Sequence, residues 1–405
     1  MEKIFGLLGC GISYTRSPQL HKALGGYDYC VFDLTSDKLD QFFNERKFDG
    51  INVTVPYKTQ CIKYLDELSP IAKKLNAVNT IVNKNGKLVG YNTDYYGFLE
   101  QAKSLEIDYK GKVVLVLGNG GAAQAVIQVF EDLGAKQVLV CSRNGELNYQ
   151  NVYEIRDTVN VIVNATPVGN SSLNCLVDLK KFANLEGVLD LVYTPIRTKL
   201  VLDALSLGKK ATGGAKMLVY QAVKASELFV GEVGQMEKAQ GVYEQFVSSL
   251  SNLVLVGMAA CGKTTIGKIL AKQTGRKFVD TDELIEQKAG MTIPEIFNKF
   301  SERRFREIET EVISELYLKN GLIISTGGGA ILKQENRDML RANGKVVFIR
   351  RRVEDCEFKG RPLFEKGGAE QVFYQRLPLY TSCADFSVDN NGSIENCVNI
   401  IKEKL

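Results

Sequence analysis

Histidine is nearly absent from this sequence, and its cysteines are widely scattered. The chain has 1 histidine, His21, and none of its 9 cysteines forms a Cys-x-x-Cys pair. Zinc sites and disulfide frameworks need clusters of these residues at short spacings. Neither kind of site is therefore expected here.

Long apolar runs are also missing. No uninterrupted stretch approaches the roughly 18 apolar residues that a membrane span needs. The N-terminal MEKIFGLLGCGISYTRSP lacks the basic start, long apolar stretch and small-residue cleavage site of a secretory signal. We therefore expect a cytoplasmic protein that does not bind membranes.

Charge of one sign does not accumulate anywhere. The net charge is +4 over 405 residues, without a basic block or arm. Charge therefore gives no support to nucleic-acid binding, and small molecules are the expected partners. The sequence contains no internal repeat, and it leaves the oligomeric state open. With 45% hydrophobic residues, it can fill the cores of two or three domains.

What the sequence does contain is an alternation of apolar runs with helix-like stretches. Apolar runs occupy residues 113–117, 137–140, 160–164 and 188–193, and again 253–256, 322–325 and 345–350. Parallel strands covered by helices have this pattern. The short polar stretch 247-VSSLSN-252 predicts a boundary between two α/β parts.

A phosphate-binding loop opens the second part. Residues 257-GMAACGKT-264 fit G-x-x-x-x-G-K-[ST] between an apolar strand and a helix. Glycines let backbone N–H groups turn toward phosphates, a lysine neutralises phosphate oxygens, and a threonine hydroxyl can ligate Mg²⁺. We predict an ATP site formed by Gly257, Gly262, Lys263, Thr264 and Thr265. Cys261 is either a reactive thiol near the helix start or a small residue filling the turn.

Further motifs follow this loop in order: 278-FVDTDELIEQKAG-290, 303-RRFREIE-309, 325-STGGGA-330, 360-GRPLF-364 and 376-RLPLY-380. Asp280 and Asp282 alternate at strand spacing, so they need not share a side. Together these motifs make residues 252–405 resemble the shikimate kinase family. The family also places an arginine against adenine near the C-terminus, and 387–405 offers none, so the adenine contacts are not predicted.

The resemblance implies a role for each matching residue. Asp282 would bind the shikimate hydroxyls and act as base for the 3-hydroxyl, while Asp280 would help Thr264 hold Mg²⁺. Arg361 would close over the transferring phosphoryl group, beside the catalytic Lys263. The remaining substrate contacts would come from two arginines that grip the carboxylate and from a close backbone approach: Arg306, Arg376, Gly327, Gly328 and Gly329.

The first part contains a different glycine turn. In 118-GNGGAA-123 the pattern G-x-G-x-x-A follows a strand, which alone is as typical of an ordinary turn as of a dinucleotide site. At the end of the next strand, Ser142 and Arg143 replace the acidic residue of an NAD site. That replacement favours the 2′-phosphate of NADP(H). The predicted cofactor residues here are Gly118, Gly120, Gly121, Ala122, Ser142 and Arg143.

A second resemblance is carried by 50-GINVTVPYK-58, 76-NAVNTI-81, 90-GYNTD-94, 164-NATPVG-169, 190-DLVYTP-195 and 217-MLVYQA-222. These motifs resemble the shikimate dehydrogenase family from residue 4 to about 245. The resemblance implies that Lys58 is the proton donor for ketone reduction and that Asp94 orients it. The alternation of Ile51, Val53 and Val55 predicts a strand that ends at Pro56, just before Lys58.

The resemblance also implies contacts around the substrate and the nicotinamide. Thr166 and Gly214 would complete the cofactor site. Family members usually have S-x-S-P where this chain has 15-TRSP-18, which retains a hydroxyl but adds a methyl group that could shift the preference between shikimate and quinate. His21 is expected to pack within a helix rather than to catalyse. The predicted substrate residues are Thr15, Ser17, Asn52, Thr54, Asn79, Tyr193 and Gln221.

These observations predict an α/β protein in three pieces. Residues 1–95 and 214–248 would form a substrate lobe, 96–213 a Rossmann lobe for NADP, and 250–405 a P-loop kinase domain with a parallel sheet. The expected function is bifunctional: reduction of 3-dehydroshikimate with NADPH, then phosphorylation of shikimate by ATP. Two alternatives are a ligand-sensing regulator that has lost catalysis, and a quinate/shikimate dehydrogenase fused to the kinase.

Overall fold

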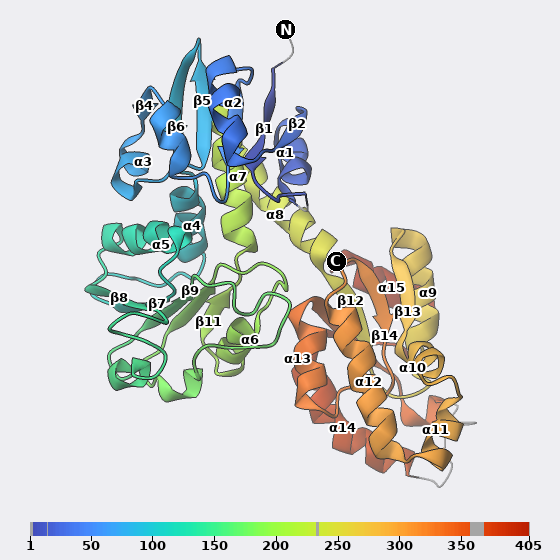
Figure 1. Cartoon of the computed structure of the whole chain (residues 1–405). Helices are drawn as coiled ribbons and strands as arrows, with labels where there is room; N and C mark the ends of the chain where they lie inside the picture. Colours follow the sequence, from blue (N-terminus) through green and yellow to red (C-terminus); the bar gives the residue numbers. More distant parts are fainter. Residues whose placement is uncertain (1–2, 14, 232–234, 357–367, 405) are drawn as a thin grey trace. The chain divides into compact units, whose positions relative to one another are not determined.

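The protein is described by a computed structural model that covers residues 3–13, 15–231, 235–356 and 368–404. The chain forms two compact units. The first comprises residues 1–169, 174–193 and 203–246, and the second 170–173, 194–202 and 247–405. Both units contain parallel strands flanked by helices (Figure 1), so the α/β class predicted from the alternation is confirmed.

The first sheet has the strand order β2-β1-β3-β5-β6-β4. Its central strand β1 runs parallel to β2 and β3, whereas β3, β5 and β6 are antiparallel neighbours. The elements of this region are β1 (Phe5–Gly9), α1 (Ser17–Gly25), β2 (Tyr29–Asp33), α2 (Leu39–Glu45), β3 (Gly50–Val53), β4 (Glu67–Leu68), α3 (Pro70–Leu75), β5 (Thr80–Lys84) and β6 (Lys87–Tyr91).

The second sheet is fully parallel, in the order β11-β10-β9-β7-β8. Its interior strand β7 (Val113–Leu117) is buried at every position, as expected for a strand covered on both faces. The crossover between 144 and 160 is too short for a full helix and contains only a short 3₁₀ turn, Val152–Ile155. The other elements are α5 (Gly121–Asp132), β8 (Gln137–Cys141), β9 (Val161–Asn164), β10 (Gly187–Asp190), α6 (Lys199–Ser206) and β11 (Lys210–Thr212).

Two packed helices join these sheets. Helices α4 (Asp94–Lys103) and α7 (Ala215–Val230) pack against each other and lie between the first and second sheets in Figure 1. Gly97 allows this close approach, because a Cβ there would lie 2.5 Å from the carbonyl oxygen of Met217. The N-termini of both helices therefore reach the space between the two sheets. Helix α8 (Gln235–Leu250) follows.

The third sheet is also fully parallel, in the order β13-β14-β12-β15-β16. Its central strand β12 (Asn252–Val256) is buried throughout. The strand order reverses beside β12, which is where parallel sheets bind ligands. The remaining elements are α9 (Lys263–Thr274), β13 (Lys277–Asp280), α10 (Thr281–Ala289), α11 (Ile293–Lys299), α12 (Glu302–Tyr317), β14 (Leu322–Ser325), α13 (Gln334–Ala342), β15 (Gly344–Arg350), α14 (Ala369–Cys383), β16 (Phe386–Asp389) and α15 (Ile394–Glu403).

Two local predictions need correction. Strand β3 ends at Val53, and Val55 is 69% exposed, so the alternation does not continue to Pro56. Asp280 ends β13 and caps α10, whereas Asp282 lies inside that helix. Residues from Thr281 onward form a helix and not a strand, because the Asp280 carboxylate accepts a hydrogen bond from the Asp282 N–H and so starts a helical turn. Among the residues that the structure describes, no helix is both long and apolar enough to cross a membrane.

Candidate active sites

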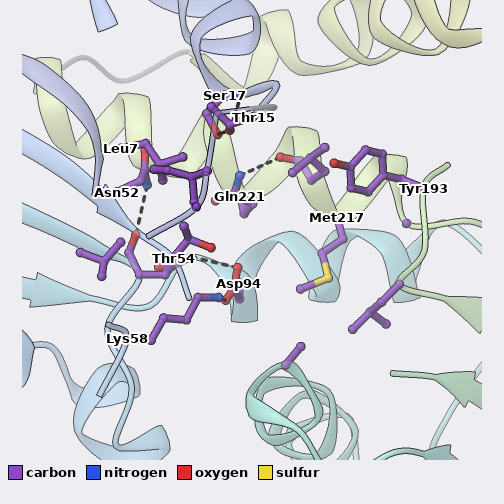
Figure 2. Close-up of a pocket in the computed structure, with 18 residues that line it drawn as sticks. Leu7, Thr15, Ser17, Asn52, Thr54, Lys58, Asp94, Tyr193, Met217 and Gln221 are labelled. Carbon is purple, nitrogen blue, oxygen red and sulfur yellow. Dashed lines mark hydrogen bonds and ion pairs between the residues drawn. The ribbon is translucent and has the colours of Figure 1, made fainter. Parts of the chain in front are cut away.

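A cavity of about 440 Å³ opens in the first unit, within the size range of small-molecule sites. Strand β3, the loop after β1 and helices α4 and α7 contribute its walls (Figure 2). All the predicted substrate residues and both predicted catalytic residues of this half line it: Thr15, Ser17, Asn52, Thr54, Lys58, Asn79, Asp94, Tyr193 and Gln221.

Lys58 and Asp94 form an ion pair inside this cavity. The Nζ of Lys58 lies 2.6 Å from Oδ2 of Asp94, and the two side chains are 28% and 14% exposed. Oδ1 of Asp94 accepts a second hydrogen bond, at 2.9 Å, from the amide nitrogen of Asn79. The lysine ammonium has three donors and gives one to Asp94, so it can also donate to a substrate oxygen.

Hydroxyl groups gather at the opposite wall. Oγ1 of Thr15 donates to Oγ of Ser17 at 3.1 Å and accepts from the Ser17 backbone N–H at 3.2 Å. The two hydroxyls therefore lie at the start of α1, where hydrogen-bond donors can bind a carboxylate. Sequence reasoning missed several apolar lining residues, although two of them lie in the MLVYQA motif: Leu7, Ile12, Val53, Leu191, Met217 and Leu218.

The first glycine turn leaves open space before α5. A Cβ added to Gly120 or Gly121 would meet no atom within 4 Å, whereas one on Gly118 would lie 2.7 Å from the Thr166 side chain. Gly118 also has φ of +103°, a conformation that favours glycine. The turn can therefore receive a pyrophosphate at the helix N-terminus, which fits a dinucleotide.

Two of the predicted cofactor residues reach the substrate cavity itself. Ala122 and Gly214 both line it. Gly214 precedes α7, and a Cβ there would lie 2.1 Å from the carbonyl oxygen of Leu191, so only glycine fits. A nicotinamide at Gly214 would therefore lie next to the Lys58–Asp94 pair. The two residues predicted to face the 2′-phosphate of NADP(H) follow strand β8. Ser142 is buried and Arg143 is exposed.

The second unit contains the phosphate-binding loop between β12 and α9. Gly257 and Gly262 have φ of +145° and +99°. A Cβ on Gly257 would lie 2.5 Å from the carbonyl oxygen of Ile349. Lys263 is 7% exposed, and its Nζ donates to the carbonyl oxygens of Gly257 and Met258 at 3.0 and 2.6 Å. Thr265 is exposed on the first turn of α9, and Cys261 is buried.

Oxygen ligands meet beside this loop. Oγ1 of Thr264 donates to Oδ2 of Asp280 at 2.9 Å and lies 3.3 Å from Oγ of Ser325. Hydroxyl and carboxylate oxygens are the ligands that Mg²⁺ prefers. The predicted pair of Thr264 and Asp280 is thus brought together, and Ser325 joins it from the end of β14, a contact that the sequence did not suggest.

The glycine cluster after β14 contacts the predicted substrate residues. A Cβ on Gly327 would lie 2.7 Å from Oδ1 of Asp282, and one on Gly329 would lie 2.4 Å from the Arg306 guanidinium. Arg376 donates to the Gly328 carbonyl oxygen at 3.1 Å. The predicted substrate position is therefore bordered by the three glycines and by the side chains beside them, those of Asp282, Arg306 and Arg376. Arg361 lies outside the described residues.

Buried Glu309 holds Arg306 in this cluster. The two side chains pair at 2.9 Å, and Glu309 is 1% exposed. Burial raises the pKa of Glu309, and the charge of Arg306 partly offsets that rise. Burial alone would lower the pKa of Arg306, but its partners Glu309 and Glu302 raise it. Arg306 is thus a fixed cation able to bind a carboxylate.

The chain is similar to known proteins in both parts. Residues 7–81 match the family described as shikimate dehydrogenase substrate binding domain, and residues 259–405 match shikimate kinase. A curated NADP(+) shikimate dehydrogenase from Clostridium beijerinckii is 34% identical over 268 residues, which cover 60% of this chain and 98% of that protein. One from Clostridium perfringens is 34% identical over 266 residues, with 60% and 98% covered.

Solved structures of shikimate dehydrogenases are also similar to this chain. A chorismate mutase/shikimate 5-dehydrogenase fusion protein from Clostridium acetobutylicum matches with a TM-score of 0.57 and 31% identity, over 61% of this chain and 97% of that one. The shikimate 5-dehydrogenase of Thermus thermophilus, in complex with NADP(H) and shikimate, matches with a TM-score of 0.53 and 30% identity, over 60% and 99%. The chain therefore belongs to the shikimate dehydrogenase family and joins to that enzyme a shikimate kinase domain, which makes it a bifunctional enzyme of the shikimate pathway.

Proposed function

We propose that the first unit reduces 3-dehydroshikimate to shikimate with NADPH and that the second phosphorylates shikimate to shikimate 3-phosphate with ATP. The observation that carries the proposal is the 2.6 Å Lys58–Asp94 pair in a cavity that Ala122 and Gly214 also line. That cavity is lined by the residues that we propose as the proton donor, as the hydroxyl-binding groups and as the nicotinamide position.

In the first reaction, the chain supplies a proton and a fixed geometry. The nicotinamide, when bound, supplies the hydride. Lys58 donates a hydrogen bond to the ketone oxygen and gives it a proton as negative charge develops there. Asp94 holds the ammonium in place and stabilises its charge before transfer. Thr15 and Ser17 bind the ring carboxylate, and Asn52, Thr54, Asn79 and Gln221 bind hydroxyl groups.

In the second reaction, the chain positions a hydroxyl against a phosphate. Mg²⁺, when bound by Thr264 and Asp280, neutralises phosphate charge. Lys263 leaves its loop carbonyls to contact the phosphates. Asp282 accepts the proton of the attacking hydroxyl, while Arg306 and Arg376 hold the substrate carboxylate and Gly327 to Gly329 contact the ring. Arg361 is proposed as the arginine that covers the transferring group.

The remaining assignments are also proposals. We assign 1–95 and 214–248 to a substrate lobe, 96–213 to an NADP lobe and 250–405 to the kinase. The exposed cation of Arg143 supports NADP(H), whose 2′-phosphate an acidic residue would repel. We further propose a cytoplasmic enzyme that binds neither nucleic acid nor membranes.

Substitution of Lys58 by alanine tests the first reaction. We expect Lys58→Ala to lower kcat for reduction of 3-dehydroshikimate by about 10²–10⁴-fold, the usual contribution of a positioned general acid, and to leave shikimate phosphorylation unchanged. Lys63→Ala, which removes a lysine that is 66% exposed, is the matched control and should retain both rates. A Lys58→Ala protein with the wild-type reduction rate would refute this role.

Quinate is a second candidate substrate of the first unit. The observation that favours it is Thr15. Its methyl group adds volume beside the Thr15 and Ser17 hydroxyls, where we propose that the substrate carboxylate binds. Oxidation of quinate and of shikimate, measured side by side with NADP⁺, distinguishes the two. Equal kcat/KM values would favour the broader activity.

A further inference from the structure

A chain of buried and half-buried polar side chains leads to the substrate cavity, and its members Tyr29, His21 and Tyr27 have no role in the proposed chemistry. It begins at Tyr29 on β2, whose hydroxyl donates to Oδ1 of Asn52 at 2.7 Å. The ring of His21, from α1, stacks on Tyr29 with centroids 4.1 Å apart and planes 7° from parallel. Nδ1 of His21 lies 2.7 Å from the Tyr27 hydroxyl.

These contacts fix the orientation of the Asn52 amide. Its oxygen faces Tyr29, and its nitrogen donates to the Asn79 carbonyl oxygen at 3.2 Å and to Oγ1 of Thr80 at 2.9 Å. A flipped amide would lose the hydrogen bond that its oxygen accepts from Tyr29 and would place that oxygen against the Asn79 carbonyl oxygen. Asn52 is 5% exposed, so water could not repair those contacts.

The chain continues from Asn52 to the catalytic pair. The hydroxyls of Thr80 and Thr93 lie 3.1 Å apart, and the Thr93 N–H donates to Oδ1 of Asn79 at 2.6 Å. With its oxygen held, Asn79 turns its nitrogen to Asp94. Asn52 and Asn79 both line the cavity (Figure 2 labels Asn52), so one network sets the direction of two of the amide side chains that line it.

His21 completes this arrangement without adding charge. It is 1% exposed, and burial lowers its pKa to about 3, although a hydrogen bond with Asn52 partly opposes the shift. The ring is therefore neutral at pH 7. A neutral ring can pack flat on Tyr29 and leave the tyrosine hydroxyl directed at Asn52.

We propose that Tyr29, backed by the His21 ring, is a positioning residue of the dehydrogenase site that fixes the direction of the Asn52 amide at the wall of the substrate cavity. The inference rests on the proposed function, because it takes Asn52 to contact the substrate. Tyr29 itself does not line the cavity. Its effect should therefore appear in substrate binding and not in the chemical step.

Tyr29→Phe in the full chain tests this role, since it keeps the stacked ring and removes only the hydroxyl. We expect the KM for 3-dehydroshikimate to rise about three- to tenfold, the usual effect of one hydrogen bond. kcat, its pH profile and the KM for NADPH should stay within twofold. The matched control is Tyr109→Phe, which removes a buried hydroxyl bonded to the Ala102 carbonyl oxygen, away from the network. It should lower the melting temperature but not change KM.

Two further measurements make the test decisive. In an Asn52→Ala background, Tyr29→Phe should change KM by less than twofold, and a full effect there would show that Tyr29 does not act through Asn52. An unchanged KM in Tyr29→Phe, or an equal rise in Tyr109→Phe, would also overturn the proposal. His21→Phe, which keeps a ring against Tyr29 but loses the bond to Asn52, gives a second variant with an expected rise in KM.

Failure of the proposed function can be told apart from failure of this inference. If the wild-type chain does not reduce 3-dehydroshikimate, the proposed function fails. Calorimetric titration with 3-dehydroshikimate, which we propose as a ligand of the first unit alone, still tests Tyr29 in that case. A three- to tenfold weaker Kd in Tyr29→Phe than in Tyr109→Phe, again about the effect of one hydrogen bond, supports the positioning role, and equal Kd values contradict it.

Discussion

The two carboxylate oxygens of Asp94 have different partners. One accepts from the Lys58 ammonium and the other from the neutral Asn79 amide. An ammonium has protons to donate, whereas a carboxylate can only accept. At the scale of single residues, the pair therefore holds the proposed proton donor, Lys58, at the wall of the cavity.

His21 gives a prediction about stability. Its pKa falls from 6.5 in the unfolded chain to about 3 in the folded one, so at pH 5 the unfolded state binds more protons. The contribution of His21 to the free energy of unfolding is fully present above pH 6.5 and is lost as the pH falls toward 3. Between pH 7 and pH 5 the wild-type first unit should lose about 2 kcal/mol from this group.

Urea unfolding of His21→Gln and wild type at both pH values measures this loss. Because His21 is the chain's 1 histidine, no other imidazole contributes to the difference. The variant should be less stable than wild type at pH 7 but should lose about 2 kcal/mol less on acidification. Parallel pH dependence in the two proteins would show that His21 titrates normally in the folded state.

At the scale of elements, both predicted nucleotide turns follow an interior strand of a parallel sheet. β7 leads through Gly118 into α5, and β12 leads through Gly257 into α9. Each strand is buried at every position, so the turn after it has a fixed place. The N–H groups at each helix start then face a place where phosphate can bind.

The glycine cluster after β14 gives a prediction at this scale. In Gly329→Ala, the new Cβ would lie 2.4 Å from the Arg306 guanidinium, which Glu302 and Glu309 hold in place. Displacement of Arg306 should raise the KM of the kinase for shikimate by about tenfold or more, because a hydrogen bond to a charged group contributes about 1.5–3 kcal/mol. Reduction by the first unit should not change.

Steady-state phosphorylation of shikimate measures the effect. Gly392→Ala is the matched control, since a Cβ there meets no atom within 4 Å. It should keep the wild-type KM. If Gly329→Ala also kept it, the carboxylate would not be bound by Arg306 in the position described.

Much of both sites could be predicted because their residues belong to short motifs next to strand ends. Lys58, Asn79 and Asp94 each lie in such a motif, and the residues of the phosphate-binding loop are consecutive in the sequence. The contact of Tyr29 with Asn52 could not be predicted in this way. It depends on the pairing of β1 with both β2 and β3, which brings together residues that no local pattern connects.

The boundaries of β3 and α10 were harder to predict for a related reason. The alternation of apolar residues suggested a strand as far as Val55, but that side chain has no apolar surface to cover it and is exposed. For Asp280 and Asp282, a single capping hydrogen bond outweighs the strand-like spacing. The spacing of residues along the sequence does not by itself reveal such contacts.

At the scale of the whole molecule, each site is contained in one unit. The cavity residues from Leu7 to Gln221 all belong to the first unit, and the described residues of the phosphate-binding site all belong to the second. Each unit therefore contains the described residues that we propose for its own reaction. This is why a substitution in one site is expected to leave the other reaction unchanged.

The chemistry of the two proposed reactions makes them consecutive. The hydroxy acid that leaves the first site has the carboxylate and hydroxyls that Arg306, Arg376 and Asp282 are placed to bind in the second. The account's central claim is that one chain converts a ring ketone into a phosphorylated hydroxy acid in two steps.

A single reaction mixture tests that claim most directly: the purified chain with 3-dehydroshikimate, NADPH, ATP and Mg²⁺, followed by NADPH absorbance and by quantifying shikimate 3-phosphate. The account predicts that NADPH is consumed and that shikimate 3-phosphate forms, and that omission of ATP stops the second signal while the first continues. Binding of both nucleotides with neither NADPH consumption nor a phosphorylated product would contradict it.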